Sequence, residues 1–346
     1  PSQLSDALVH TLCGTGRMKH VFFIHSHITW LVSGGVIRYR GLACEDVLFV
    51  CSRGYEPPDT SIETIAFPDR GWLLTWRPDK WLRDRRELAQ FVDRVAQDVD
   101  FLWYLPHTGF LFFRAFIQHP RCQGFHLIEE GIGSYYTQDE IAVSMQRAPV
   151  SIPGWRGWLQ RRWASLFPPE MADRRYLFAY GSTDEAFPGY ERRVKVELVG
   201  RTQPSDENID TVLVMDNFLE TGLVDERTFF SCLDELMTML ANQGCKKVHY
   251  KLHPGQHVDP RYAPRLRQML QGNRYGVDFK ELPASFCLEL LAATGRPCFY
   301  IFISSVGYYA AVSGCRVYSM ASRLAAIDAR YTVIKDIIPE VMSRRV

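Results

Sequence analysis

Residues 298–307, CFYIFISSVG, decide the fold of this chain. The six apolar or aromatic residues at 298–303 predict a strand that is buried on both faces of a sheet. The serine pair that follows predicts a turn, and residues 306–313 predict a helix. The wider stretch 297–315 contains no charged residue and has the length of a membrane span. Because serines and glycines interrupt it, we interpret it as a buried strand, turn and helix.

Similar apolar runs recur along the chain, with helical patterns between them. The runs that predict strands are residues 20–24, 46–50, 101–105, 124–128, 211–215, 247–252, 298–303 and 315–320. The apolar residues that mark helix faces are Leu88, Phe91, Val92, Val95 and Val99, and then Phe229, Leu233, Leu236, Met237 and Leu240. Nearly continuous apolar strands that alternate with helices are typical of parallel sheets covered on both faces.

A polar stretch separates the two halves of the chain. Residues 200–208, GRTQPSDEN, have the composition of a linker. We therefore predict an α/β protein of GT-B type, with two Rossmann-like domains that face a central cleft. The predicted domains are residues 1–199 and 200–346, with the last helix packing back on the first domain. A single larger doubly wound domain and a periplasmic-binding-protein arrangement are the alternatives.

The composition excludes several classes of protein. With 346 residues, 47% hydrophobic and 23% charged, the chain predicts a folded protein with room for two cores. Its 40 basic and 39 acidic residues give a net charge of +1, which argues against a dedicated nucleic-acid binder. Nine cysteines without a C-x-x-C pattern indicate neither a disulfide framework nor a zinc site, and they favour a reducing compartment. The first residues lack the apolar core of a signal peptide, and Pro1 suggests a trimmed N-terminus.

Two adjacent carboxylates, Glu129 and Glu130, follow the predicted strand at 124–128 and precede Gly131. Ligands of open α/β sheets bind beyond the carboxyl ends of the strands. Because the two charges repel, one carboxyl group should have a raised pKa, and such a group can take a proton from an attacking hydroxyl. Gly131 allows the backbone to approach a ligand closely. The alternative is a loop whose acids cap the next helix.

A histidine and a serine pair follow strands in the second half. His253 comes directly after residues 247–252, and Pro254 fixes the turn that follows. An imidazole there can reach a phosphate and give a proton to a leaving group. Ser304 and Ser305 open the predicted helix, whose free N–H groups suit an anion. The alternatives are a histidine satisfied by backbone groups and a simple serine N-cap.

Further polar residues at strand ends are positioned to line the cleft. They are His25, Ser26 and His27 after the first strand of the chain, and Asp216 and Asn217 after the first strand of the second half. Simple turn chemistry is the alternative for both groups.

Two other patterns are interpreted as structural. His119-Pro120 precedes a strand rather than following one, which indicates a turn. Asp98-Val99-Asp100 resembles a metal-binding D-x-D, but it ends a helix, so we interpret it as a solvated helix end. The chain contains no P-loop, G-x-G-x-x-G or G-x-S-x-G pattern, which disfavours nucleotide triphosphatases, dinucleotide enzymes and serine hydrolases.

Residues 153–169, PGWRGWLQRRWASLFPP, combine tryptophan with arginine. Trp155, Leu159, Trp163 and Leu166 can share one helical face, with arginines beside or opposite it. Such a helix is typical of an interfacial membrane anchor, and it predicts a peripheral membrane contact through residues 155–167. A surface helix packed on the domain is the alternative.

Taken in order, the acid-acid-glycine, His-Pro and Ser-Ser motifs resemble those of bacterial CMP-sialic-acid-dependent sialyltransferases and polysialyltransferases. The resemblance lies in the order of short motifs across roughly residues 125–310. It implies that Glu129 is the general base and that Glu130 supports it. It also implies that His253 contacts the CMP phosphate and acts as general acid, and that Ser304 and Ser305 hold that phosphate.

The resemblance extends less closely to a ribose-binding helix with a Phe-Glu pair. The comparable segment is SFCLELL, residues 285–291, in which Cys287 and Leu288 separate Phe286 from the candidate Glu289. By their place in the chain, we assign four more residues to the donor side and four to the acceptor side. These are Pro254, Gly255, Asp216 and Asn217, and then His25, Ser26, His27 and Gly131.

The implied activity is an inverting, metal-independent transfer of sialic acid from CMP-Neu5Ac to a hydroxyl of a glycan acceptor, without a cofactor. The acceptor would be a lipooligosaccharide or capsule-type glycan or glycolipid, and the protein would lie in the cytoplasm at the inner face of the bacterial inner membrane. No nucleic-acid partner is expected. The alternatives are a transferase for another CMP-activated acid sugar such as Kdo, a non-catalytic GT-B-like glycan-binding protein, and a sugar-nucleotide epimerase or hydrolase of similar fold.

Overall fold

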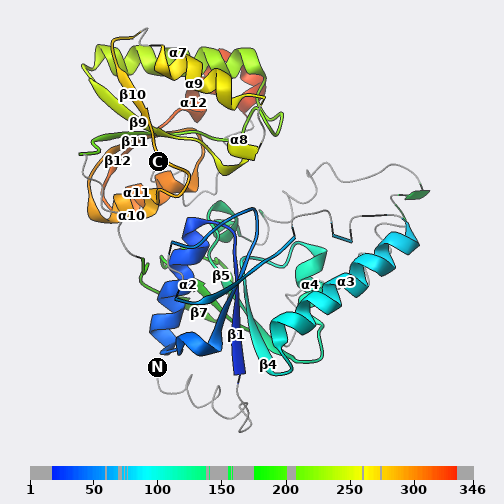
Figure 1. Ribbon diagram of the computed structural model, residues 1–346. Coiled ribbons are helices and arrows are strands. Elements are labelled where there is room, and N and C mark those ends of the chain that lie inside the picture. Colours follow the sequence, from blue (N-terminus) through cyan, green and yellow to red (C-terminus); the bar gives the residue numbers. More distant parts are fainter. Residues whose placement is uncertain are drawn as a thin grey trace. The chain divides into compact units, whose positions relative to one another are not determined.

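The computed structural model divides the chain into two compact units, Pro1–Val199 and Gly200–Val346 (Figure 1). We call them unit 1 and unit 2. The structure describes residues 18–58, 61–68, 72–73, 75, 77–137, 140, 155–156, 158, 175–200, 208–258, 261–272 and 275–332. Within these residues each unit has its own parallel sheet, which rules out the alternative of one larger doubly wound domain.

The described part of unit 1 contains a seven-stranded parallel sheet in the order β3-β2-β1-β4-β5-β6-β7. Its strands are β1 (Met18–Ile24), β2 (Val47–Cys51), β3 (Glu63–Ala66), β4 (Asp100–Leu105), β5 (Cys122–Ile128), β6 (Tyr176–Gly181) and β7 (Arg193–Lys195). The four strands expected in the first half are confirmed as β1, β2, β4 and β5. The strand order reverses between β1 and β4. Ligands of such sheets bind beside this switch point, at the carboxyl edge where the parallel strands end.

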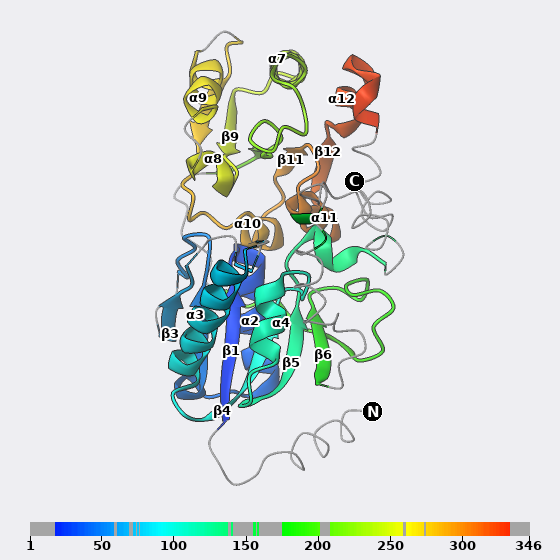
Figure 2. The same ribbon diagram turned by 90° about the vertical axis from the view of Figure 1, so that its right-hand side faces the viewer.

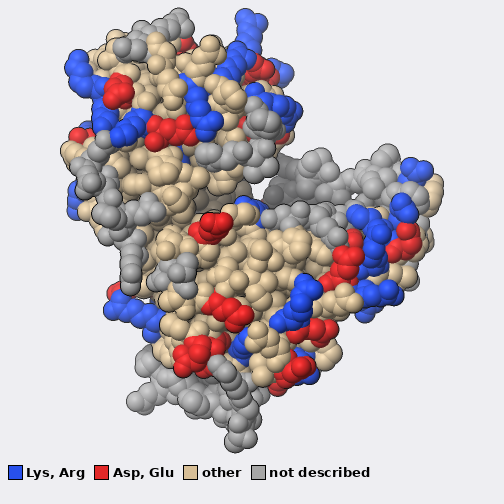
Figure 3. Space-filling view, in the orientation of Figure 1, with Lys and Arg blue, Asp and Glu red and all other residues tan. Residues whose placement is uncertain are grey.

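Helices cover both faces of this sheet. The helix α2 (His27–Arg40) lies on one face, and α3 (Pro78–Ala96) and α4 (Leu111–Ile117) lie on the other (Figures 1 and 2). The predicted helix face of α3 is confirmed for Leu88, Phe91, Val92 and Val95, which are buried, whereas Val99 lies beyond the end of the helix. Basic and acidic side chains are interspersed along its outer side (Figure 3). Two short 3-10 helices complete the described helical segments, η1 (Cys44–Asp46) and η2 (Ile132–Tyr135).

Polar contacts fix both ends of α2. At its start, the N–H of Thr29 donates to the hydroxyl of Ser26 at 3.4 Å, and the N–H of Ser26 donates to the hydroxyl of Thr29 at 3.1 Å. At its end, the Arg40 guanidinium donates to Tyr104 Oη on β4 at 2.6 Å and to His126 Nε2 on β5 at 3.0 Å. Together these contacts hold α2 in place, so that its beginning lies beside the carboxyl end of β1.

The described part of unit 2 contains a five-stranded parallel sheet in the order β10-β9-β8-β11-β12. Its strands are β8 (Thr211–Val214), β9 (Lys247–Lys251), β10 (Asp278–Glu281), β11 (Cys298–Ile301) and β12 (Arg316–Ser319). The four expected strands are confirmed as β8, β9, β11 and β12, whereas β10 was not predicted. The order reverses between β8 and β11, so unit 2 has a switch point of the same kind as unit 1.

Each face of the unit 2 sheet has its own apolar core. On one face lie α7 (Glu226–Asn242), α9 (Ala263–Gln271) and α12 (Ala321–Ile327), and on the other lie α10 (Leu288–Thr294) and α11 (Ser305–Val312) (Figures 1 and 2). The short α8 (Pro254–Val258) follows β9. The predicted helix at 306–313 is confirmed as α11, one residue earlier.

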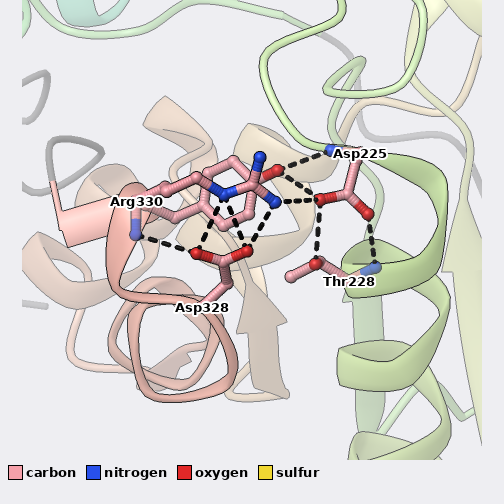
Figure 4. A network of polar contacts seen from close by, with 5 residues as sticks. Asp225, Thr228, Asp328 and Arg330 are labelled. Carbon is pink, nitrogen blue, oxygen red and sulfur yellow. Dashed lines mark hydrogen bonds and ion pairs between the residues drawn. The ribbon is translucent and has the colours of Figure 1, made fainter.

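A polar network attaches the end of the described chain to the start of α7 (Figure 4). Asp225 is the N-cap of α7 and accepts the N–H of Thr228 at 2.9 Å. Arg330 and Tyr331 donate to its Oδ2 at 3.0 and 2.6 Å, and Asp328 accepts further bonds from Arg330. The last described helix, α12, therefore packs within unit 2. The expected packing of a last helix on the first domain falls on residues 333–346, outside the described residues.

The interpretations of the D-x-D pattern and of residues 297–315 that were made from the sequence agree with the fold. The D-x-D pattern begins just beyond α3, where the side chain of Asp98 is 95% exposed and pairs with Arg121 at 2.9 Å. Residues 297–315 contain β11 and α11. In the part of the chain that the structure describes, no helix has the length and apolarity needed to cross a membrane.

Candidate functional site

Three side chains from separate strands meet at the carboxyl edge of unit 1. His25 follows β1, His107 follows β4 and Glu130 follows β5, so they lie beside the switch point. Oε2 of Glu130 lies 3.7 Å from Nε2 of His25 and 3.8 Å from Nε2 of His107. The exposed fractions of the side chains are 7% for His25, 18% for Glu130 and 30% for His107. The edge thus presents a partly exposed carboxylate between two imidazoles.

The neighbouring Glu129 has a different environment, because it is fully buried. Its Oε1 accepts a hydrogen bond from Tyr135 Oη at 2.5 Å, and its Oε2 accepts the N–H of Ser182 at 2.5 Å. Tyr135 ends η2, and Ser182 follows β6. This carboxylate therefore joins the loop after β5 to the loop after β6.

The loop after β5 leaves room for Glu130. The N–H of Glu130 donates to Ser134 Oγ at 3.0 Å. Gly131 has a φ of 120° and a ψ of −140°, a conformation that side chains disfavour strongly. A Cβ atom at Gly133 would lie only 2.6 Å from Oε1 of Glu130. The alternative that the acids cap the next helix is wrong, since Gly131 is the N-cap of η2 and no side chain caps it.

The other residues predicted after β1 are engaged in local contacts. Burial, together with the nearby charges of Arg53 and His107, lowers the pKa of His25 to about 3. His25 is therefore neutral at physiological pH. Ser26 caps α2, and Nδ1 of His27 lies 3.0 Å from Tyr55 Oη. The acceptor-side roles of these residues stay predictions.

His107 is the functional candidate that sequence reasoning missed. Its Nδ1 accepts the N–H of Gly109 at 2.9 Å, which leaves the proton of the neutral ring on Nε2. That nitrogen is the one that faces Glu130. The signal that could have found it is a histidine within two residues of the end of a strand, with a glycine two residues later, as in His253-Pro254-Gly255.

In unit 2, Asp216 links the strands on either side of the switch point. It follows β8, and its Oδ2 accepts the N–H of Ile303, which follows β11, at 3.2 Å. Its carbonyl oxygen accepts a hydrogen bond from Gln256 in α8 at 3.1 Å. Burial raises the pKa of Asp216 to about 6, although the N–H groups of Ile303 and Phe302 oppose the rise. Asp216 therefore orders the loop that leads into α11.

His253 is held in one orientation by the turn after β9. Its N–H donates to Gln256 Oε1 at 2.9 Å, and its Nδ1 accepts the N–H of Gly255 at 3.0 Å. The neutral ring consequently carries its proton on Nε2. A Cβ atom at Gly255 would lie 3.8 Å from the side-chain nitrogen of Asn217, so the turn after β9 adjoins the end of β8.

His119 is the internal control for this turn. Its Nδ1 accepts the N–H of Arg121 at 3.3 Å, as in the other two turns, but its Nε2 lies 3.1 Å from Asp93 Oδ1 on α3. The interpretation of His119-Pro120 as a turn before a strand is confirmed. The same local turn thus serves a structural contact here, and only its position after a strand distinguishes His107 and His253.

The serine pair lies at the start of α11, as the sequence predicts. Ser304 is the N-cap, and its hydroxyl accepts the N–H of Val306 at 3.4 Å. Ser305 is the first helical residue, and both serines are half-buried. A Cβ atom at Gly307 would lie 2.2 Å from Ile301 Cδ1, so the start of the helix packs tightly on β11. The alternative interpretation, a simple serine N-cap, therefore explains Ser304 but not Ser305.

Glu289 occupies the first turn of α10 and is 8% exposed. Its Oε2 accepts a weak hydrogen bond from Cys287 Sγ at 3.5 Å. The buried Lys251 at the end of β9 lies near it and donates to the carbonyl of Phe286 at 2.5 Å. Burial lowers the pKa of Lys251, and the charge of Glu289 opposes this. Lys251 is a second polar residue that sequence reasoning missed, because it stands inside a strand pattern.

Most of the tryptophan- and arginine-rich segment falls outside the described residues. Trp155 and Trp158 are 60% and 59% exposed, and the guanidinium of Arg156 lies 5.5 Å from the ring centre of Trp155. The shared helical face of Trp155, Leu159, Trp163 and Leu166 cannot be followed further, since residues 159–174 are not described. The membrane contact stays a prediction.

The described residues contain no group of three or more His, Cys, Asp or Glu side chains arranged to hold a metal ion. The cluster of His25, His107 and Glu130 is therefore not such a group. Metal-independent chemistry stays a prediction.

No family model and no curated protein sequence matches the chain. Solved structures do. A co-structure of S. aureus MnaA with UDP has a TM-score of 0.51 and 8% identity, covering 88% of this chain and 79% of that chain. A Methanocaldococcus jannaschii UDP-GlcNAc 2-epimerase in complex with UDP-GlcNAc and UDP has a TM-score of 0.50 and 12% identity, covering 94% and 92%.

The chain has a GT-B-type fold. This confirms the predicted class of two Rossmann-like domains and decides against the periplasmic-binding-protein arrangement. At identities of 8% and 12%, the likeness concerns the fold and leaves the chemistry to the residues of the two carboxyl edges.

Proposed function

We propose that this protein is an inverting glycosyltransferase that moves sialic acid from CMP-sialic acid to a hydroxyl of a glycan acceptor. The observation that carries the proposal is the complementary chemistry of the two switch points. A carboxylate between two imidazoles lies at the carboxyl edge of unit 1, whereas hydrogen-bond donors suited to a phosphate lie at that of unit 2.

The donor side would be unit 2. Nε2–H of His253 and the first N–H groups of α11, with the hydroxyls of Ser304 and Ser305, are donors that suit a phosphate. Because Gly255 and Asp216 hold the two loops, these donors need little rearrangement when charge grows on the departing phosphate. Glu289 would bind the ribose.

The acceptor side would be unit 1. A carboxylate of the Glu129–Glu130 pair would take the proton of the acceptor hydroxyl while that oxygen attacks the anomeric carbon of the sialyl residue. The bond from this carbon to the phosphate oxygen breaks, and CMP leaves with the electron pair. One displacement of this kind inverts the anomeric configuration. The general-acid role of His253 stays a prediction of the resemblance.

The choice of CMP-sialic acid rests on the order of the three motifs, Glu129-Glu130-Gly131, His253-Pro254 and Ser304-Ser305. A donor carrying another CMP-activated acid sugar such as Kdo would use the same phosphate contacts. A second candidate function is epimerisation or hydrolysis of a nucleotide sugar. It is favoured by the likeness to structures described as containing UDP or UDP-GlcNAc, one of them a 2-epimerase. A GT-B-like protein that only binds glycans remains the non-catalytic alternative.

The test is incubation of the protein with CMP-Neu5Ac and acceptors that end in lactose, galactose or sialic acid, with parallel arms for CMP-Kdo and UDP-GlcNAc. Product mass and linkage are read by mass spectrometry and NMR. A sialylated acceptor supports the proposal, whereas a 2-epimer from UDP-GlcNAc, or CMP release with free sugar alone, supports the second candidate. Tight CMP binding without turnover on any acceptor overturns both.

A matched pair of variants ties the activity to the proposed phosphate site. His253→Asn and His119→Asn change histidines with the same backbone contact to Nδ1, but only His253 follows a strand. We expect His253→Asn to weaken CMP binding by about tenfold, since a buried charge-assisted hydrogen bond is worth about 1.5 kcal/mol or more. His119→Asn should bind CMP as the wild type does. Equal affinities of all three proteins would contradict the assignment.

A cytoplasmic location at the inner membrane face is part of the proposal, because lipid-linked glycans are presented there. The exposed Trp155 and Trp158 with the adjacent Arg156 support a peripheral contact. Flotation with vesicles of anionic and zwitterionic lipid tests it. A Trp155→Ser/Trp158→Ser double variant should lose vesicle binding and keep activity on a soluble acceptor. No binding of the wild type to either vesicle would rule this contact out.

A further inference from the structure

We infer that Glu130, and not Glu129, is the carboxylate that takes the proton of the acceptor hydroxyl, and that Glu129 has a structural role. The inference rests on the proposed function, which requires such a base in unit 1. It departs from the resemblance, in which the first acid is the base. The environments of the two carboxylates carry it.

Glu129 has no access to a substrate in this structure. Its side chain is fully buried, and its two oxygens accept hydrogen bonds from Tyr135 and from the N–H of Ser182, both at 2.5 Å. A general base must come within about 2.6–3.2 Å of the atom whose proton it takes. To reach an acceptor, Glu129 would have to give up both contacts, which is costly because the N–H of Ser182 would lose its acceptor and Tyr135 Oη would keep only Thr183 Oγ1. Its contacts instead hold together the two loops that follow β5 and β6.

Glu130 meets the geometric requirement. Its side chain is 18% exposed at the carboxyl edge of the sheet, where open α/β folds bind their ligands. Gly131, with its φ of 120°, turns the chain away directly after it. The absence of a side chain at Gly133 gives its Oε1 space, since a Cβ atom there would lie at 2.6 Å. The loop is thus shaped around the carboxylate of Glu130.

The two imidazoles act as positioning residues for this carboxylate. Nδ1 of His107 accepts the N–H of Gly109, so its Nε2–H faces Oε2 of Glu130 at 3.8 Å. His25 faces the same oxygen at 3.7 Å, and the charge of Arg53 acts on His25 from the loop after β2. An N–H group that faces a carboxylate oxygen favours one orientation of the carboxylate, so the rings can hold Glu130 ready for an acceptor hydroxyl.

The first test compares Glu130→Gln and Glu129→Gln, with Glu197→Gln as a control for an 84% exposed carboxylate of the same unit. With CMP-Neu5Ac and lactose, we expect Glu130→Gln to lower kcat by about 10²–10⁴-fold, the usual contribution of a general base. Its melting temperature should equal that of the control. Glu129→Gln should lower the melting temperature, because an amide has one acceptor oxygen for two donors. It should keep the turnover of the molecules that remain folded.

Chemical rescue separates the two roles further. Formate can enter the space left by Glu130→Ala, because that side chain is partly exposed, and it should restore part of the turnover. It should not restore Glu129→Ala, whose site is enclosed. Full turnover in Glu130→Gln, or a loss in Glu129→Gln without any loss of stability, would overturn the inference.

Separate measurement of kcat and KM tests the imidazoles, with His119→Ala as the matched control for His107→Ala. Without the N–H of His107, the carboxylate of Glu130 loses a neighbour that orients it, so kcat should fall while KM stays near the wild-type value. Neither constant should change in His119→Ala, whose ring faces Asp93 instead. An unchanged kcat in His107→Ala would remove His107 from the mechanism.

Labelling without any substrate separates this inference from the proposed function. A water-soluble carbodiimide with glycine ethyl ester modifies accessible carboxyl groups, and tandem mass spectrometry distinguishes adjacent residues. Glu130 should be labelled in the folded protein and Glu129 only after unfolding. Faster labelling of Glu129 would overturn the inference whatever the protein catalyses. If only Glu130 is labelled but no donor sugar is transferred, the proposed function is wrong. Glu130 is then accessible as inferred but has no acceptor hydroxyl from which to take a proton.

Discussion

The two carboxyl edges hold their polar side chains in different ways. In unit 2, main-chain N–H groups bind His253, Asp216 and Ser304. In unit 1, a main-chain N–H also binds His107, but the accessible carboxylate of Glu130 faces two imidazoles at 3.7 and 3.8 Å, farther than a direct hydrogen bond. Groups held by the backbone keep one geometry, which suits recognition of a phosphate. Groups that face one another across a short gap can exchange protons with a substrate, which suits acid–base chemistry.

The largest effect is expected where unit 1 does use a main-chain contact. Glu129→Ala leaves the N–H of Ser182 without its acceptor, and Tyr135 Oη keeps only its contact with Thr183 Oγ1 at 3.1 Å. We expect a loss of about 3 kcal/mol or more in the free energy of unfolding of unit 1. All 8 tryptophans of the chain lie before residue 200, so their fluorescence in urea reports on unit 1 alone.

Glu197→Ala is the control, because its side chain is 84% exposed. It should leave the urea midpoint within about 0.5 kcal/mol of the wild type. Equal midpoints for Glu129→Ala and Glu197→Ala would show that the buried carboxylate does not support the edge.

The second prediction concerns the pH dependence of unit 2. The pKa of Asp216 is raised by burial to about 6 in the folded protein, against 3.8 for the free side chain. Between about pH 4 and pH 6 the folded state binds a proton that the unfolded state lacks, so stability falls as the pH rises through this window. Asp216→Asn should remove this slope, which amounts to at most about 3 kcal/mol.

Asparagine keeps an acceptor for the N–H of Ile303, so the loop before α11 should stay in place. The measurement is urea denaturation at several pH values, followed by circular dichroism. The unfolding of unit 2 is the transition that circular dichroism detects and tryptophan fluorescence does not. A slope of opposite sign, or an unchanged slope in Asp216→Asn, contradicts the prediction.

Removing a single backbone contact in unit 2 should have a smaller effect. Ser304→Ala deletes the side-chain cap of α11, which costs about 1 kcal/mol. Ser305→Ala removes a hydroxyl that caps nothing in the described contacts, and its stability should be near that of the wild type. If the hydroxyls also bind phosphate, both variants should weaken CMP binding, as calorimetry would show. Normal affinity in both would limit the serines to a structural role.

The smallest effect is expected in the exposed polar network of Figure 4. Tyr331, Thr228 and Arg330 lower the pKa of Asp225 to about 2. The charge of Asp225 therefore adds stability above about pH 4, and this is lost as the pH falls towards 2. Because the pair with Arg330 is exposed, Asp225→Asn should cost only about 0.2–1 kcal/mol at pH 7. The same denaturation series measures it, and a larger loss than in Ser304→Ala would reverse the ranking.

Local patterns predict much of this protein, because they depend on neighbours in the sequence. The apolar run at 298–303 gave β11, the serine pair gave the start of α11, and the spacing of Leu88, Phe91 and Val92 gave the buried side of α3. The position of His253 after a strand was predicted for the same reason.

The difference between Glu129 and Glu130 could not be predicted in this way. It depends on Ser182, which reaches Glu129 across 53 positions of sequence, and on His25 and His107, which meet Glu130 only when β1, β4 and β5 lie side by side. Lys251 was missed because one side of β9 accommodates a buried amine beside Glu289. Such long-range partners leave no mark on the residues next to them.

The turn that holds His253 also limits what its ring can do. While Nδ1 accepts the N–H of Gly255, the ring is neutral, and losing its Nε2 proton would create an imidazolate. To deliver that proton as an acid, the ring must first be protonated on Nδ1, and the contact with Gly255 must then break. Proton donation and the closed turn are therefore mutually exclusive. The imidazole can serve as a fixed hydrogen-bond donor without cost, whereas each delivery of a proton would require the contact between Nδ1 and the N–H of Gly255 to break and form again once per catalytic cycle.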